Sequence, residues 1–271
     1  MFKNLFHYTD VGAVRSILEK CELWLTDIRF LNDSQELNEG VSYVLEALKA
    51  DVYDGSLVEH LVSAQEMLSS DISNHVSHYI NIEPTFVCSF SEAGDQLSQW
   101  RAYGDYAIEF DPEITDLDLF ECIYDEEGKK REAKNITSSA IYGVAAECLD
   151  NQGAFGPESE RYLQTLVRVA STIKDQSFHE EREVRCLVDV HLPSESLNFR
   201  QKSGMLVPYV REKIPFEAIK AVHVGPMRNQ ELACTAMKAF ILTLRHKRLS
   251  EYGHADHTIN VIMSKIPYRS L

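Results

Sequence analysis

The order of apolar segments along the chain constrains the fold more than any other feature. Short runs typical of strands, such as Phe2–Tyr8 and Thr85–Ser91, alternate with long helical patterns at irregular intervals. The sequence has no steady strand–helix–strand rhythm, no internal repeat and no Pro/Gly/Ser-rich linker. We therefore expect a single α+β domain over residues 1–271 rather than a doubly wound parallel sheet.

The residue pattern also predicts most helices and strands. Asp10 is placed to cap a helix whose apolar positions Val14, Ile17 and Leu18 follow helical spacing. Two helical stretches, at about 34–81 and 131–176, are expected as insertions between strands. The other expected elements are strands at Leu23–Leu25, Tyr106–Phe110, Glu183–Val190, Leu206–Val210, Ala221–Val224 and Ile259–Met263, a cap at Asn32-Asp33-Ser34, a short helix or tight loop at Asp95–Tyr103 and helices at 131–150, 157–176 and Met227–Lys247.

Charge and cysteine usage argue against several classes of protein. The chain has 27 Lys and Arg against 42 Asp and Glu, a net charge of −15 that repels phosphate backbones and disfavours broad nucleic-acid binding. The six cysteines are widely spaced, without a C-x-x-C, and we expect reduced core thiols rather than a disulfide or zinc framework. Because the sequence has neither an apolar leader nor a membrane-length apolar stretch, we expect a cytoplasmic protein without membrane contact.

Several familiar motifs are absent from the sequence. It contains no G-x-G-x-x-G, no P-loop, no G-x-S-x-G and no H-E-x-x-H. His75 and His78, like His254 and His257, have a spacing that suits a metal, but no Cys or acidic ligands stand at recognisable intervals beside them. We interpret them as surface histidines and predict no metal site.

Polar side chains are concentrated in two strand segments far apart in the sequence. His7 and Thr9 would share one face of the first strand, because side chains alternate with period two. Glu181, Glu183 and Arg185 alternate in the same way at the start of a later apolar strand. The alternatives are a satisfied core histidine with a capping threonine, and a solvated strand edge that shields the sheet.

A third polar segment lies in the middle of the chain. Ser89 and Ser91 would project to one face of the strand at 85–91. Trp100, Arg101 and Tyr103 follow closely and offer a stacking surface and a fixed cation. The alternative is an ordinary strand end with a buried tryptophan.

Taken together, these segments resemble a bacterial family catalogued as domain of unknown function 2971. The matching residues, which extend over the whole chain, are His7-Tyr8-Thr9, Trp24-Leu25, Phe30-Leu31-Asn32-Asp33, Ser89-Phe90-Ser91, Leu97-Ser98-Gln99-Trp100-Arg101-Ala102-Tyr103-Gly104, Glu181-x-Glu183-x-Arg185, Pro208-Tyr209 and Gly225-Pro226.

The histidine strand, the S-x-S strand and the E-x-E strand start are also similar to the parts that ADP-ribosyltransferases assemble around NAD. This second resemblance implies mixed sheets of the ADP-ribosyltransferase type, with inserted helices. The chain departs from the arginine-type toxins of that fold, which carry arginine where this sequence has His7.

The resemblance implies roles for the two carboxylates. Cleavage of the nicotinamide–ribose bond produces an oxocarbenium-like centre, which a neighbouring carboxylate stabilises. We assign this role to Glu183 and assign activation of the acceptor, as a general base, to Glu181. The two roles are interchangeable on the sequence alone.

The remaining candidate residues would bind NAD as co-substrate. His7 and Thr9 would hold the adenosine-side ribose or the adenine, and Ser89 and Ser91 would brace the nicotinamide ribose or the catalytic glutamate. The residues expected to stack on nicotinamide or to meet the pyrophosphate are Tyr8, Trp100 and Tyr103 for stacking and Arg101 for the pyrophosphate.

The function implied by the resemblance is an NAD-dependent ADP-ribosyltransferase that modifies a macromolecule, protein or nucleic acid, as a toxin or phage-defence effector with a neutralising partner protein. Three alternatives stay open. The chain would instead hydrolyse NAD as a glycohydrolase, bind a nucleotide or a partner protein without catalysis, or act as a nuclease through His7, Glu181 and Glu183.

Overall fold

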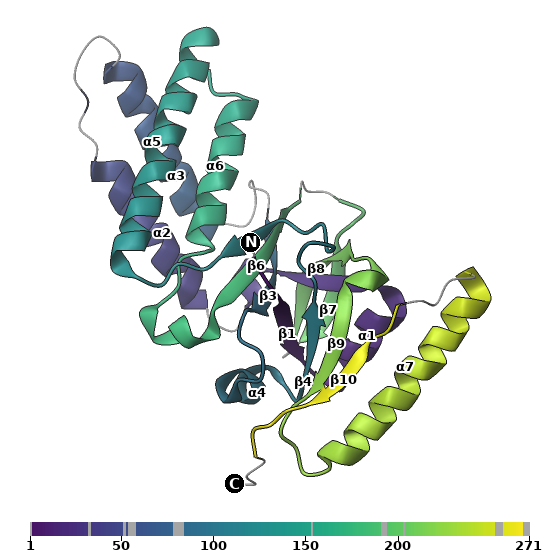
Figure 1. Ribbon diagram of the computed structural model, residues 1–271. Helices are drawn as coiled ribbons and strands as arrows, with labels where there is room; N and C mark the ends of the chain where they lie inside the picture. Colours follow the sequence, from purple (N-terminus) through teal and green to yellow (C-terminus); the bar gives the residue numbers. More distant parts are fainter. Residues whose placement is uncertain are drawn as a thin grey trace.

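The computed structural model describes most of the chain, and Figure 1 shows its arrangement. The described residues are 2–31, 34–50, 53, 58–77, 84–152, 154–190, 194–202, 204–252 and 257–267. Within these ranges no helix combines the length and apolarity needed to cross a membrane. The cap residues Asn32 and Asp33, and one member of each histidine pair, His78 and His254, lie outside the described residues.

The fold is α+β, as expected, with one large sheet and seven α-helices in the described part. The strands are β1 (Leu5–Thr9), β2 (Glu22–Asp27), β3 (Thr85–Ser91), β4 (Tyr106–Phe110), β5 (Leu119–Glu121), β6 (Glu183–Asp189), β7 (Asn198–Lys202), β8 (Met205–Lys213), β9 (Ile219–Val224) and β10 (Asn260–Met263). The helices are α1 (Val11–Lys20), α2 (Ser34–Ala50), α3 (Val58–Ser77), α4 (Leu97–Tyr103), α5 (Glu126–Asp150), α6 (Pro157–Ala170) and α7 (Gln230–Tyr252), with 3₁₀ turns η1 (Ile28–Phe30), η2 (Gln176–Glu181) and η3 (Phe216–Ala218).

The sheet is mixed and divides at β3. Its main order is β10-β9-β4-β1-β3-β2-β8-β7, and every pair is antiparallel except β9 with β10. β6 pairs with β3 along its full length, so β1 and β2 share the opposite edge of β3. β1 meets that edge only at Ser91, and β2 meets it only at Phe86 and Val87. The two strands therefore separate over the middle of β3.

One apolar core lies between the sheet and the helices α1 and α7. Asp10 caps α1 by accepting a hydrogen bond from the Ala13 N–H, and Val14, Ile17 and Leu18 are buried, as the sequence predicts. These side chains pack against strand residues of β1 to β4 and β6. Figure 1 shows α7 lying along the side of the sheet that carries β9 and β10.

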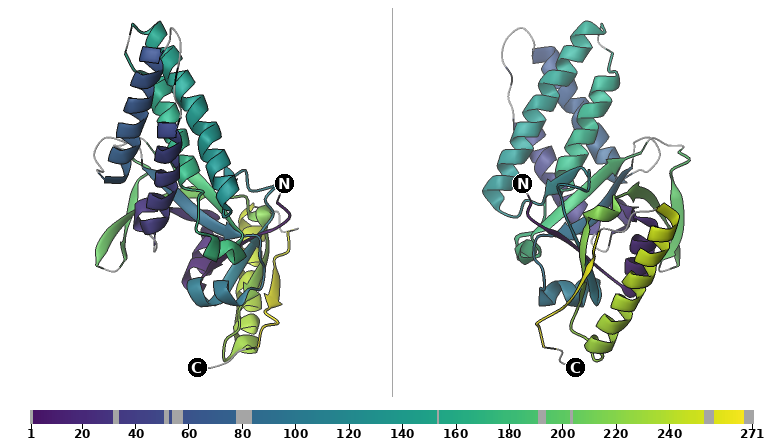
Figure 2. Two further views of the ribbon diagram at one scale, coloured as in Figure 1. Left: turned by 90° about the vertical axis from the view of Figure 1, so that its left-hand side faces the viewer. Right: turned by 45° about the vertical axis from the view of Figure 1, so that its right-hand side comes forward.

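The two inserted stretches come together as one bundle. Each stretch contributes two helices, α2 with α3 and α5 with α6, and these share a second apolar core. Gly40 allows close packing there, because a Cβ at this position would lie 1.9 Å from the carbonyl oxygen of Ala170. Figures 1 and 2 show the bundle projecting from one end of the sheet, and its core extends to Val87 of β3 and Leu187 of β6.

Several element boundaries differ from the sequence-based prediction. α6 ends at Ala170, well before residue 176, and the Ser171 hydroxyl caps it by donating to the Val167 carbonyl. β7 was not predicted, because its sequence, Asn-Phe-Arg-Gln-Lys, has no apolar alternation. It forms by hairpin pairing with β8, so its stability comes from backbone hydrogen bonds rather than from a buried face.

The six cysteines are free thiols, and five of them are buried, in agreement with the expectation of core thiols. Among the described residues, no three His, Cys, Asp or Glu side chains lie close enough together to hold a metal ion, so none of the cysteines belongs to such a group.

Candidate functional site

A large cleft opens where β1 and β2 separate. Its volume is about 1090 Å³, slightly above the usual range of roughly 300–1,000 Å³ for small-molecule sites, and β1, β2, β3, β6, β7 and α1 all contribute to its walls. His7 occupies the gap in the sheet. Its Nδ1 lies 2.9 Å from the Ser89 carbonyl oxygen, which has no strand partner at this edge in the described structure. A side chain thus satisfies a backbone group that the divided sheet leaves open.

The hydrogen bond to Ser89 fixes the state of the His7 imidazole. A carbonyl oxygen only accepts, so Nδ1 carries the hydrogen and Nε2 of the neutral ring remains an acceptor. Burial lowers the pKa of His7 below its usual value, and the hydrogen bond to the Ser89 carbonyl only partly opposes this shift. At neutral pH the cleft therefore presents a neutral imidazole whose Nε2 accepts no hydrogen bond from the residues that the structure describes, and this atom suits a ligand hydroxyl.

The chain turns sharply where it enters β6, and this turn presents Glu181 to the cleft. Glu181 ends the 3₁₀ turn η2, and Arg182 adopts a left-handed conformation, with φ 44°, before β6 begins at Glu183. Two side chains hold the turn from neighbouring segments. The Ser91 hydroxyl donates to the Glu181 carbonyl (2.5 Å), and the Tyr124 hydroxyl accepts from the Glu183 N–H (2.8 Å).

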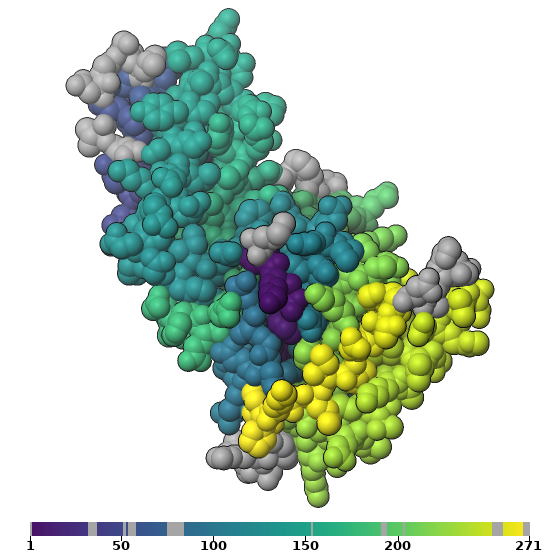
Figure 3. Space-filling view, in the orientation of Figure 1, coloured from purple at the N-terminus to yellow at the C-terminus, as the bar shows by residue number. Residues whose placement is uncertain are grey.

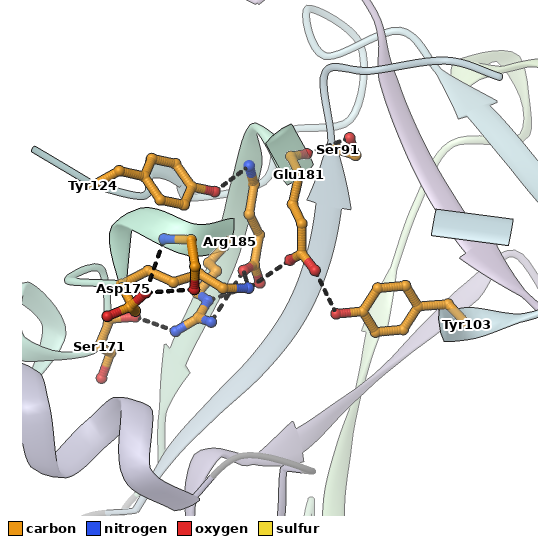
Figure 4. Close-up of polar contacts among 10 residues, drawn as sticks. Ser91, Tyr103, Tyr124, Ser171, Asp175, Glu181 and Arg185 are labelled. Carbon is orange, nitrogen blue, oxygen red and sulfur yellow. Dashed lines mark hydrogen bonds and ion pairs between the residues drawn. The ribbon is translucent and has the colours of Figure 1, made fainter. Parts of the chain in front are cut away.

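A buried charge cluster forms the floor of the cleft (Figure 4). Glu183 is only 6% exposed, and its Oε1 accepts from Arg185 Nε at 2.8 Å. Its Oε2 accepts from Lys174 Nζ at 2.6 Å and from Arg185 Nη2 at 3.1 Å. Burial alone would raise the pKa of Glu183, but the charges of Arg185 and Lys174 and their hydrogen bonds outweigh it and lower the pKa to about 2. This carboxylate is ionised throughout the physiological range.

Lys174 joins the two carboxylates of the cluster. Its Nζ lies 2.5 Å from Glu181 Oε2 as well as 2.6 Å from Glu183 Oε2. Its position is set by the backbone, because its N–H donates to the Ile123 carbonyl at 3.0 Å. The other Glu181 oxygen lies 3.4 Å from the Tyr103 hydroxyl, which points toward it from α4 (Figure 4). Glu181 is thus the outer and less tightly held of the two carboxylates.

The structure brings most of the predicted site residues to this one cleft. The cleft, with the small recess that adjoins it, is lined by His7, Tyr8, Thr9, Ser89, Ser91, Tyr103, Glu181 and Glu183. The segments that carry these residues are separated by up to 176 positions in the sequence, and their meeting depends on β3 lying between β1 and β6.

Two predicted residues lie elsewhere. Trp100 is buried and stacks edge-on against Tyr8 (centroids 4.6 Å apart), while its indole N–H donates to Asp95 at 3.0 Å. It braces β1 from behind and does not line the cleft. Arg101 is exposed on α4 and is also absent from the cleft walls. Gly104 ends this helix with φ 135°, and a Cβ there would lie 2.5 Å from the Thr9 carbonyl oxygen.

The structure also places cations in the cleft that sequence reasoning missed. Lys174 follows the end of α6 and carries no motif, and Arg200 lies in the polar strand β7. Trp24, on β2, also lines the cleft and stacks on Tyr209 with centroids 4.3 Å apart. Arg200 could have been found from the sequence only if the pairing of β7 with β8 had been known in advance.

The site therefore combines an ionised carboxylate, a second carboxylate near the rim, a neutral imidazole and basic groups within one cleft. Such an arrangement suits an anionic ligand with hydroxyl groups.

Figure 3 shows that the bundle and the sheet form one continuous surface in this orientation. Comparison of the chain with protein-family models, with curated proteins and with solved structures finds no match.

Proposed function

We propose that this chain binds NAD in the cleft and cleaves its nicotinamide–ribose bond, transferring ADP-ribose to a macromolecular acceptor on a fold of the ADP-ribosyltransferase type. The observation that carries the proposal is the ionised Glu183 carboxylate on the cleft floor, in the same cleft as His7 and Ser89. A fixed negative charge is what an oxocarbenium-like transition state requires.

The proposed step uses two carboxylates in different roles. The bond between C1′ of the ribose and the nicotinamide nitrogen breaks, its electron pair stays on nicotinamide, and Glu183 stabilises the positive charge left on the ribose. Glu183 Oε1 accepts a hydrogen bond from Arg185 Nε, and because a carboxylate oxygen can accept more than one, a ribose hydroxyl would donate to it as well. The acceptor nucleophile then bonds to C1′ and gives its proton to Glu181.

The remaining residues would hold the dinucleotide. His7 Nε2 would accept a hydrogen bond from a ribose hydroxyl, and Tyr103 would offer its ring near the rim. Ser91 is assigned to bracing rather than to binding, because its hydroxyl already donates to the backbone of the Glu181 turn. We propose a toxin or phage-defence role for such an activity, with a neutralising partner protein.

A second candidate function is a catalytically silent nucleotide-binding module. The double ion pair favours it, because Lys174 and Arg185 neutralise much of the charge that Glu183 would otherwise offer to a cation-like transition state. The same cations would improve binding of an anionic ligand.

The test is release of free nicotinamide from NAD by the purified full chain, with and without cell extract. Release only with extract is expected for transfer, whereas equal release without extract indicates NAD hydrolysis. The Glu183→Gln variant should lower release by at least about 10³-fold. Glu180→Gln is the matched control, because Glu180 is exposed on the adjacent turn and lies outside the cleft walls.

Each outcome separates the candidates. No nicotinamide release, together with a melting temperature raised by NAD, supports the silent binding module. If NAD is not cleaved and does not raise the melting temperature, the proposal of an NAD site is wrong altogether. Degradation of nucleic acid without NAD supports a nuclease. Full activity of a folded Glu183→Gln variant contradicts the role given to this carboxylate.

A further inference from the structure

The wall of the cleft formed by β2 and β7 carries an arginine whose charge is not neutralised within the described structure. Arg200 extends from the edge strand β7 across β8 to β2, where its Nη2 donates to the Thr26 hydroxyl at 2.7 Å. The other two cations described above, Lys174 and Arg185, are both paired with glutamates. Arg200 has no carboxylate partner among the described residues, in a chain with a net charge of −15.

Aromatic side chains fix the plane of this guanidinium. The Arg200 Cζ lies 5.8 Å from the centroid of Trp24 and 5.9 Å from that of Tyr209, and these two rings stack on each other. Cation–π contact and the Thr26 hydrogen bond together hold the group in one orientation. A fork held in this way is arranged for a planar, bidentate anion rather than for water.

The guanidinium is also incompletely satisfied. Its Nε is buried and has no hydrogen-bond partner among the described residues. An unsatisfied buried donor costs free energy, so its retention calls for a compensating role. An anion bound by the terminal N–H groups would not pair with Nε itself, but its charge would stabilise the partly buried guanidinium as a whole.

The separation of Arg200 from Glu183 indicates the shape of the ligand. Thr26, which holds Arg200, lies opposite Val87 on β3, whereas Glu183 lies opposite Ser91. Two strand spacings across the sheet and four residues along it place the two backbone positions roughly 16 Å apart. A ligand that contacts both ends of the cleft must therefore be extended.

From this geometry we infer that Arg200 is the phosphate-binding group of the site and takes the diphosphate of an adenosine diphosphate moiety, while the reacting ribose lies at Glu183. The inference rests on the proposed function for the identity of the ligand. It replaces Arg101, the arginine expected from the sequence, with one that lines the cleft.

The test is calorimetric titration of the full chain with ADP, adenosine and inorganic pyrophosphate. The wild-type chain should bind ADP at least about tenfold more tightly than adenosine, and more tightly than pyrophosphate. In Arg200→Gln the preference for ADP over adenosine should disappear, with adenosine affinity unchanged. Arg200→Lys should keep an intermediate preference, because it retains the charge but not the fork.

Arg211→Gln is the matched control, because Arg211 also lies near the Tyr209 ring (6.0 Å), two residues along the same strand β8, but is exposed and lies outside the cleft walls. It should bind ADP as the wild type does. The inference is overturned if Arg200→Gln retains the full preference for ADP, or if the wild type binds pyrophosphate as tightly as ADP.

This titration is independent of the nicotinamide assay. Nicotinamide release with an ADP preference that survives Arg200→Gln would leave the cleavage proposal standing and remove the subsite. An ADP preference that depends on Arg200, without nicotinamide release, would support the subsite and contradict cleavage.

Discussion

The helix bundle and the cleft solve the problem of burial in opposite ways. The bundle buries apolar side chains such as Leu68 and Ile72, which are fully shielded from solvent and need no partners. The cleft floor buries Lys174, Glu183 and Arg185, whose charges are stable there only because each has a partner of opposite sign.

The two kinds of burial contribute differently to stability and to function. Apolar packing stabilises a region without giving it chemical specificity, and the loss of one methyl group is a local cost. A buried charge cluster contributes little net stability, but it fixes the ionisation and orientation of its members. A protein therefore has reason to maintain such a cluster where chemistry or binding occurs.

The largest expected change in the free energy of unfolding comes from a substitution within the charge cluster. Glu183→Ala removes the carboxylate that pairs with both Lys174 and Arg185, so the free energy of unfolding at pH 7 should fall by about 3–5 kcal/mol. Urea denaturation followed by circular dichroism measures this change. A loss below about 1 kcal/mol would show that the two cations rearrange freely and that the cluster is not a rigid unit.

Acid should destabilise the cleft and leave the bundle comparatively unaffected. The pKa of Glu183 is lowered from its ordinary value of 4.5 to about 2 in the folded chain. Its stabilising contribution is therefore complete above about pH 4.5 and is lost as the pH falls toward 2. The shift corresponds to about 3 kcal/mol. Because pH 3 still lies above the folded pKa, about 2 kcal/mol of this should be lost between pH 6 and pH 3. Denaturation of the wild type and of Glu183→Gln at these two pH values measures the loss as a difference.

Other titrating groups are largely common to both proteins in this comparison. The lowered pKa of His7, for example, makes both of them less stable as the pH falls below 6.5, and so its effect cancels. Equal acid sensitivity of the two proteins would contradict the ionised state assigned to Glu183.

The smallest expected effect is in the bundle. Ile72→Val removes one buried methylene group between α3 and its neighbours and should lower the free energy of unfolding by about 1 kcal/mol. This cost should be the same at pH 6 and pH 3, and the affinity for ADP should not change. A change in ADP affinity would instead show that the bundle and the cleft are energetically coupled.

Much of the fold follows from local sequence. The α1 cap at Asp10, the buried positions of that helix and the apolar strands β3 and β6 all agree with the pattern of residues. The pattern failed for β7, whose polar sequence gives no strand signal, and for the end of α6, where a hydroxyl cap rather than a Gly or Pro stops the helix.

Local sequence also predicted only some residues of the candidate site, because it reveals polar groups within apolar strands but not those in polar stretches. His7, Ser89 and Glu183 stand out because polar side chains in apolar strands are unusual. Lys174 and Arg200 occupy ordinary polar stretches, and Trp100 was placed in the cleft although it packs behind it. Residue type does not reveal which side of a helix faces a distant strand.

The sequence by itself determined the secondary-structure class, the helix cap and the polar positions within strands, because these depend on residues a few places apart. The tertiary structure alone decided the separation of β1 from β2, the meeting of Lys174 with Glu183 and the reach of Arg200 to Thr26, 174 positions away. These contacts form only when the chain closes long loops, and their geometry is set by sheet register, which no short segment encodes.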